Sequence, residues 1–144
     1  MGLEIPLPPF DVPQVAQLAS KYEIRLDRRL VEHIATYTGG DPYLAHLLLY
    51  SWWKQPGSRG SIFDGASAGG GVFNNHLRRY CVLFDRHEEL RTAMRAVLVG
   101  EAVEDQRVVD RLMATGLVRA DSRGRLVPAS TLYEEYFRSL WAMA

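Results

Sequence analysis

A helix end and a helix start meet in the stretch YTGGDPYL, residues 37–44. Glycine is favoured just past a helix C-terminus, because it reaches the left-handed backbone region without steric cost, and proline is favoured in the first turn of a helix. Apolar residues recur at helical spacing on both sides of Gly39, Gly40 and Pro42. The stretch therefore predicts two helices joined by a tight turn.

Residues 1–55 predict one small helical subdomain. Asp11 is expected to start a helix that runs to about residue 22, and Asp27 is expected to start a second helix that Gly39 ends. The third helix begins at Pro42. It is expected to bury a set of apolar side chains at helical spacing, namely Leu44, Leu47, Leu48 and Trp52. Three short helices with short turns make a compact bundle.

Glycine and serine dominate residues 56–71, so this segment is expected to be a linker. A phosphate-binding loop would need Gly-Lys followed by Ser or Thr after a buried strand, and the segment has neither. Residues 2–10 alternate like a strand without a nearby partner strand, which suggests that part of a longer protein precedes them.

Residues 72–144 predict a second domain that begins with three helices. Asn74 or Asn75 is expected to cap the first helix, residues 88–99 form the second, and Asp105 caps the third. The expected core positions of the third helix are Val108, Val109, Leu112 and Met113.

A β-hairpin and a last helix complete this domain. Residues 117–120 and 126–128 are strand candidates on either side of a turn that contains Gly124. Thr131 and Glu134 predict a capping box for the last helix. The order helix, helix, helix, hairpin, helix is that of a winged helix.

Composition excludes several classes of function. Seventeen basic and seventeen acidic residues cancel, so the chain lacks the positive charge typical of proteins that bind nucleic acid or anionic membranes. Cys81 is the only cysteine, which excludes an internal disulfide and a cysteine-based zinc cluster. No apolar run approaches the roughly 20 residues of a membrane span, and no secretory signal is recognisable, so we expect a cytoplasmic chain without a membrane partner.

Residue patterns for catalysis are absent. The four histidines lack metal-ligand spacing, adjacent glutamates point to different helix faces, and no serine has a nucleophile-elbow context. We expect no catalytic residue, no metal site and no enzyme activity in this chain.

The junction at residues 37–44 resembles the lid motif of the AAA+ superfamily, in its STAND branch of signalling ATPases. The stretches FNNHLRRY (73–80), TGLV (115–118) and LYEEYFR (132–138) look like the bacterial "AAA-like domain" subgroup. The resemblance covers nearly the whole chain, but only the part of the family that follows the ATPase core. It implies a mainly α chain with a three-helix AAA+ lid-type subdomain (1–55), a Gly/Ser-rich linker (56–71) and a winged-helix domain with one small β-hairpin (72–144).

In the resembled family, the lid turn lies against bound nucleotide. Gly40 and Pro42 would then contact the nucleotide, with Pro42 on the adenine, and free amides at the helix start would suit an electronegative ligand edge. The chain lacks Walker A and Walker B motifs and a recognisable arginine finger. It is therefore expected to hold no cofactor alone, and ATP or ADP only together with an upstream core. Ser130 stands where many STAND proteins have a diphosphate-binding histidine, which puts an ADP-dependent latch in doubt.

DNA binding is one alternative. The candidate contacts are Arg107 and Arg111 on the third helix of residues 72–144, and Arg123 and Arg125 in the hairpin. Neighbouring aspartates offset these arginines, and phosphate contacts need an excess of positive charge. We therefore favour a solvated face, and nucleic acid is a disfavoured partner.

A protein-docking surface is the other alternative. Trp52 and Trp53 are adjacent on the third helix of residues 1–55, so at least one of them is expected to be partly exposed. Arg78 is a further candidate for docking.

The sequence thus predicts a non-catalytic regulatory region of a STAND-type AAA+ signalling protein from bacteria. It would couple the nucleotide state of an upstream ATPase core to an effector module or to oligomer partners. A stand-alone protein-binding adaptor and a winged-helix DNA-binding regulator are the alternatives.

Overall fold

The computed structural model describes residues 10–54 and 73–143, most of which are helical. The chain divides into two compact units, Met1–Phe63 and Asp64–Ala144, and each is described here by itself. The prediction of a mainly α chain with one small antiparallel hairpin is confirmed for the described residues. The predicted linker at residues 56–71 and the lead-in at residues 2–9 lie outside them.

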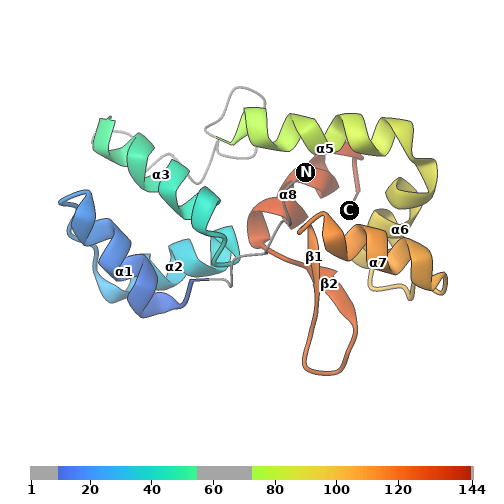
Figure 1. The fold of residues 1–144 in the computed structure, drawn as a ribbon, viewed down its shortest axis with the longest axis horizontal. Helices are drawn as coiled ribbons and strands as arrows, with labels where there is room; N and C mark the ends of the chain where they lie inside the picture. The colour runs from blue at the N-terminus through green and yellow to red at the C-terminus, as the bar shows by residue number, and fades with distance from the viewer. Residues whose placement is uncertain (1–9, 55–72, 144) are drawn as a thin grey trace, which may run out of the picture. The chain divides into compact units, whose positions relative to one another are not determined.

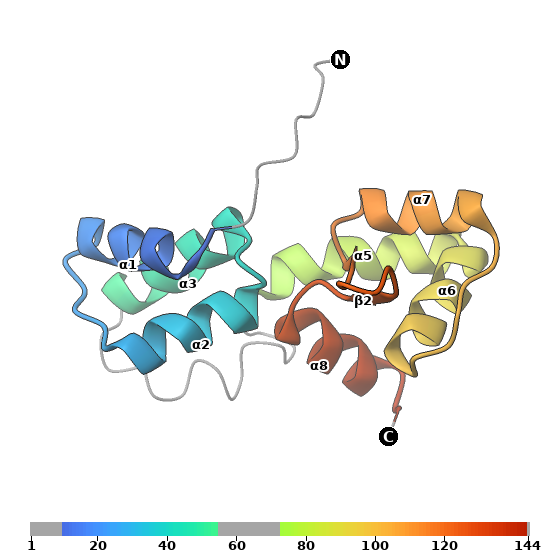
Figure 2. The same cartoon turned by 90° about the horizontal axis from the view of Figure 1, so that it is seen from below.

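The first unit is a bundle of three helices, seen from two sides in Figures 1 and 2. These helices are α1 (Val12–Lys21), α2 (Arg28–Thr38) and α3 (Pro42–Lys54). Asp11 forms a capping box with Gln14, since each side chain bonds the backbone amide of the other residue at 2.9 Å. Asp27 caps α2 by accepting from the amide of Leu30 at 2.8 Å. Both predicted helix starts are confirmed.

Helix α3 is the most apolar helix of this bundle. Leu44, Leu48 and Trp52 are fully buried, as predicted, whereas Leu47 is half-buried. The core of the first unit consists of apolar side chains from all three helices, among them Val15, Leu18, Val31, Ile34, Tyr37, Leu44, Leu48 and Trp52.

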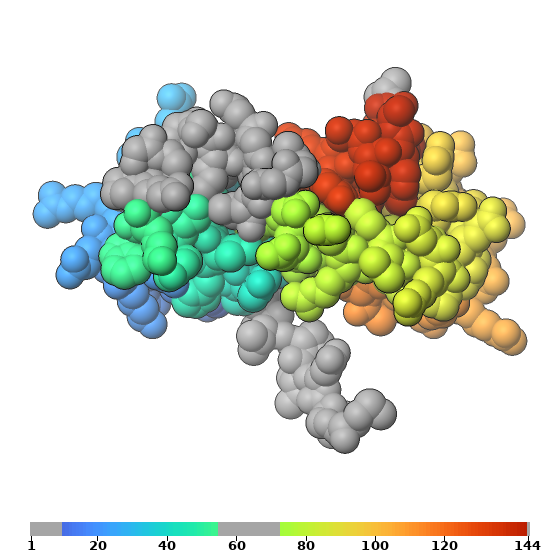
Figure 3. Space-filling model, turned by 90° about the horizontal axis from the view of Figure 1, so that it is seen from above, coloured from blue at the N-terminus to red at the C-terminus, as the bar shows by residue number. Residues whose placement is uncertain are grey.

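The second unit contains four described helices and the hairpin. In chain order its elements are α5 (Asn74–Arg86), α6 (Glu88–Leu98), α7 (Gln106–Ala114), β1 (Val118–Ala120), β2 (Leu126–Pro128) and α8 (Thr131–Leu140). Helix α8 lies against α5, and the space-filling view shows the two side by side (Figure 3). Aromatic rings join them in edge-to-face contacts, because Phe84 meets Phe137 at 5.3 Å and Trp141 at 5.4 Å between ring centroids.

The hairpin turn is held by one carboxylate. Asp121 accepts from the amides of Arg123 and Arg125, each at 2.9 Å, and Gly124 has a φ of +77°. The strands pair antiparallel, with Arg119 opposite Val127. The backbone bonds lower the pKa of Asp121, the bond from Arg125 having the largest effect.

Three local predictions for this unit are wrong. Neither Asn74 nor Asn75 caps α5: the N-cap position belongs to Phe73, which makes no side-chain capping bond. Phe73 is fully buried, and burial of a phenylalanine, about 1.5–3 kcal/mol, outweighs an N-cap bond of about 1 kcal/mol. Met113 is 42% exposed rather than in the core. The cap of α8 is Ser130 rather than Thr131, since its side chain accepts from the amide of Tyr133 at 3.2 Å.

Candidate functional site

The turn between α2 and α3 is built from two glycines in the left-handed region. Gly39 has a φ of 65° and Gly40 a φ of 75°. The amide of Gly40 donates to the carbonyl of Ala35 at 2.9 Å, which satisfies one of the last carbonyls of α2. Gly40 also accepts from the amide of Phe10 at 2.6 Å. The segment that precedes α1 and the turn that precedes α3 are therefore bonded to each other.

Pro42 is the first residue of α3, and Asp41 caps the helix. The Asp41 carboxylate accepts from the amides of Tyr43 and Leu44, at 2.8 and 3.3 Å. The expectation of free amides at this helix start is wrong, because proline has none and the next two are bonded. What the turn leaves partly exposed is the ring of Pro42, which is half-buried. The turn therefore suits an apolar contact better than an anion.

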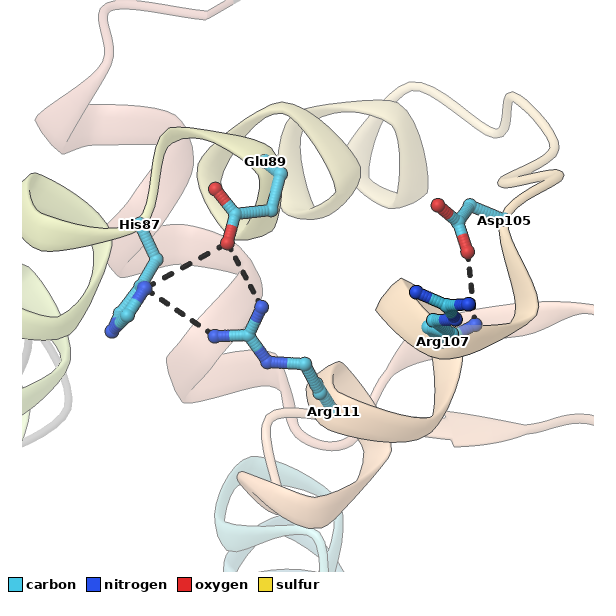
Figure 4. A network of polar contacts seen from close by, with 5 residues as sticks. All are labelled: His87, Glu89, Asp105, Arg107 and Arg111. Carbon is cyan, nitrogen blue, oxygen red and sulfur yellow. Dashed lines mark hydrogen bonds and ion pairs between the residues drawn. The ribbon is translucent and has the colours of Figure 1, made fainter.

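The four arginines proposed as DNA contacts do not form one uniform surface. Arg107 and Arg111 lie on α7, and Arg123 and Arg125 lie in the hairpin turn; all four are exposed. Arg111 is bonded to Glu89 of α6, with 2.8 Å between Nη1 and Oε1 (Figure 4). A guanidinium that is already paired is less available to a phosphate.

His87 completes this contact between α6 and α7. Nη2 of Arg111 lies 3.3 Å from Nδ1 of His87, and that nitrogen lies 3.7 Å from the Glu89 carboxylate (Figure 4). A guanidinium can only donate, so Nδ1 of His87 is the acceptor in this contact. The three side chains are 40–49% exposed.

The pKa of Glu89 is lowered by its surroundings. The hydrogen bond from its own backbone amide, in the first turn of α6, has the largest effect, and the hydrogen bond from Arg111 is second. Both favour the charged carboxylate. The cluster is therefore an exposed ion pair that joins two helices.

The proposed docking residues have different environments. Trp52 is fully buried and belongs to the core of its bundle, so its assignment to a docking surface is wrong. Trp53 is 55% exposed, which fits the expectation that one of the two is accessible. Arg78 is exposed on α5.

Trp53 shares an exposed aromatic surface of α3 with Tyr50 and Tyr43, two residues that the sequence did not suggest. The Trp53 ring lies 5.9 Å from the Tyr50 ring. Tyr43, two helical turns before Tyr50, is 52% exposed. The Nζ of Lys54 lies 5.7 Å from the Tyr50 ring centroid, a cation–π contact. Residues seven and three apart share one helix face, which is the signal that could have found this surface.

Comparison with known proteins identifies the family. The pattern of the family described as "AAA-like domain" matches residues 1–139. The chain belongs to the AAA-like domain family. No curated protein and no solved structure matches it.

Two further properties of this AAA-like domain concern its described residues. They contain no group of three or more His, Cys, Asp or Glu side chains placed to hold a metal ion. None of the helices in residues 10–54 and 73–143 has the length and hydropathy of a membrane span.

Sequence reasoning missed the partners of Arg111 in the AAA-like domain. Glu89 and His87 lie 22 and 24 residues before it, and no local pattern links such distant positions. It also missed His76, whose Nε2 lies 2.8 Å from the hydroxyl of Tyr133 and joins α5 to α8.

Proposed function

We propose that this chain is a non-catalytic regulatory region of a STAND-type AAA+ signalling protein. In this proposal α1–α3 act as the lid over a nucleotide held by an upstream ATPase core. Residues 72–144 act as a winged helix that passes the nucleotide state to an effector or to oligomer partners. This proposal is supported by family membership over residues 1–139.

The α2–α3 turn gives the proposal a specific contact. Because the Asp41 carboxylate occupies the amides of Tyr43 and Leu44, the nucleotide contact would be made by the Pro42 ring against the adenine base. The two left-handed glycines fix the direction in which α3 starts. ATP or ADP would be held mainly by the core, with Gly40 and Pro42 closing one side.

The first experiment measures the mass of the native polypeptide in source cells with an antibody against this chain. A band several times larger than 16.3 kDa supports a regulatory region of a larger ATPase. A band at 16.3 kDa contradicts it and favours the stand-alone adaptor.

The second experiment places Pro42→Ala in that larger protein and measures ADP and ATP affinity by calorimetry. Loss of one apolar ring contact, about 1 kcal/mol, is expected to weaken binding about fivefold. Pro13→Ala is the matched control, since Pro13 is exposed in the first turn of α1. If the Pro42 and Pro13 variants bound ADP and ATP with equal affinity, the α2–α3 turn would not contact the nucleotide.

The adaptor alternative is favoured by the exposed aromatic surface of Tyr43, Tyr50 and Trp53. Exposed aromatic residues that share one helix face are typical of a surface that binds another protein. In this alternative the chain would bind its partner through α3 with little dependence on salt.

A further inference from the structure

A groove of about 640 Å³ runs between α6, the connection that follows it, and α7. Its floor is made of small apolar side chains, namely Ala93, Ala96, Ala102, Val103 and Val108. A floor of alanine and valine leaves room for the long aliphatic part of an incoming side chain, which can be covered there without displacing a larger residue.

The rim of this groove is acidic. Four carboxylate residues line it, namely Glu88, Glu89, Glu104 and Asp105, whereas its lining includes no lysine or arginine. Glu88 and Glu89 are paired at one end, with Arg91 at 3.8 Å and Arg111 at 2.8 Å. At the other end, the Asp105 carboxylate accepts from the backbone amide of Arg107 at 3.0 Å and forms no ion pair with a basic side chain among the described residues (Figure 4). The groove therefore suits a cationic side chain with an apolar stem.

The β-hairpin of the same unit has the opposite character. Arg119, Arg123 and Arg125 are all exposed on it, against the single acid Asp121. One oxygen of the Asp121 carboxylate accepts from the amides of Arg123 and Arg125 within the turn, each at 2.9 Å. The hairpin thus presents arginines whose stems match the groove floor and whose guanidinium groups match its rim.

We propose that the hairpin turn of a second copy of this chain occupies the α6–α7 groove. The aliphatic stems of the arginines would lie on the alanine floor, and their guanidinium groups would bind Glu104 and Asp105. Arginine can bind a carboxylate through two parallel hydrogen bonds, which lysine cannot. Exposed ion pairs are individually weak, so the association is reversible and salt-sensitive. This inference does not rest on nucleotide binding or on the proposed lid.

Sedimentation velocity of the full chain at increasing concentration tests the association. We expect the sedimentation coefficient to rise with concentration at about 0.05 M salt and to stay at the monomer value at about 0.5 M salt. A chain that stays monomeric at low salt overturns the proposal.

Charge exchange tests the two surfaces. Glu104→Arg alters the groove and Arg123→Glu alters the hairpin, and each is expected to weaken self-association at least about tenfold. The double variant Glu104→Arg/Arg123→Glu should recover most of it, because the exchanged charges can pair. Glu135→Arg, on an exposed position of α8, is the control and should associate like the unchanged chain.

Mixing separates a lost contact from a damaged fold. The Glu104→Arg chain keeps an intact hairpin and the Arg123→Glu chain keeps an intact groove, so the two should associate with each other although neither associates with itself. Failure of the mixture and of the double variant, with native circular dichroism for both chains, overturns the proposal.

Discussion

Gly39 and Gly40 define the turn before α3 through the backbone alone. Two consecutive left-handed residues would cost roughly 1–2 kcal/mol each with a side chain, and glycine avoids this cost. Gly40 is buried, and both its amide and its carbonyl are bonded. The position of Pro42 is therefore set by hydrogen bonds rather than by its own contacts.

The Glu89 carboxylate gives a prediction at the residue scale. Arg111→Ala is expected to raise the pKa of Glu89 toward its ordinary value without reaching it, because the bond from the backbone amide of Glu89 remains. The pKa is read from the side-chain carboxyl signal in a carbon NMR titration. Arg107→Ala is the control and should leave the titration unchanged. An unchanged pKa in Arg111→Ala would mean that the ion pair does not form in solution.

The same carboxylate sets a direction for stability against pH. Its pKa in the folded chain lies below the ordinary value, so its charged form stabilises the fold above the ordinary pKa. This contribution is lost as the pH falls through the folded pKa. Because Arg111→Ala removes part of the shift, it should reduce the pH dependence of unfolding in this range.

The start of α8 shows the limit of local pattern at the element scale. Ser130 and Thr131 are both capping residues, and the sequence favoured Thr131 because Glu134 follows three residues later. In the structure Ser130 is buried and bonds the amide of Tyr133, which extends the helix by one residue. Ser130 thus has a structural role of its own at the start of α8.

We therefore expect Ser130→Ala to lower the free energy of unfolding by about 1 kcal/mol, the usual loss for an N-cap. Thr131→Ala, one residue on, should change it by less than about 0.5 kcal/mol. Urea denaturation followed by circular dichroism measures both. If Thr131→Ala were the more damaging change, the capping box predicted from the sequence would be correct and Ser130 would not be the cap.

Helix order and the hairpin could be predicted because their signals are local. Asp11, Asp27 and Asp105 cap helices as expected, and Gly124 lies in the turn. The errors occur where burial decides. Phe73 takes the N-cap position of α5 because its ring is buried in the core, and Met113 is exposed although its spacing matches Leu112 and Val109. Periodicity marks one face of a helix, but it does not show how far a neighbouring element covers that face.

For the candidate site, the sequence predicted residues but not their partners. It placed Gly40, Pro42 and the arginines on the correct elements, because glycine, proline and capping signals are short-range. It did not predict that Asp41 occupies the helix amides, or that Glu89 pairs with Arg111. Both depend on side-chain geometry, the second across helices that are distant in sequence.

At the scale of the whole molecule, charge argues against the DNA-binding alternative. Basic and acidic residues are equal in number, and the exposed arginine Arg111 is paired with Glu89. The groove beside α7 is acidic, which would repel phosphates. We therefore expect the α7 face to bind a duplex poorly.

We expect the full chain to bind duplex DNA more weakly than about 0.1 mM at physiological salt, the weak limit of non-specific binding. Fluorescence anisotropy with a labelled duplex measures this affinity. Tight binding that falls steeply with salt, and that Arg107→Ala or Arg123→Ala weakens, would instead establish the winged-helix regulator.

The bond between the amide of Phe10 and the carbonyl of Gly40 also has a mechanical meaning. Tension applied along the chain from its N-terminal side would reach the α2–α3 turn directly through this bond, before it had to pass through α1 and α2. A pull at residue 10 would thus load the start of α3.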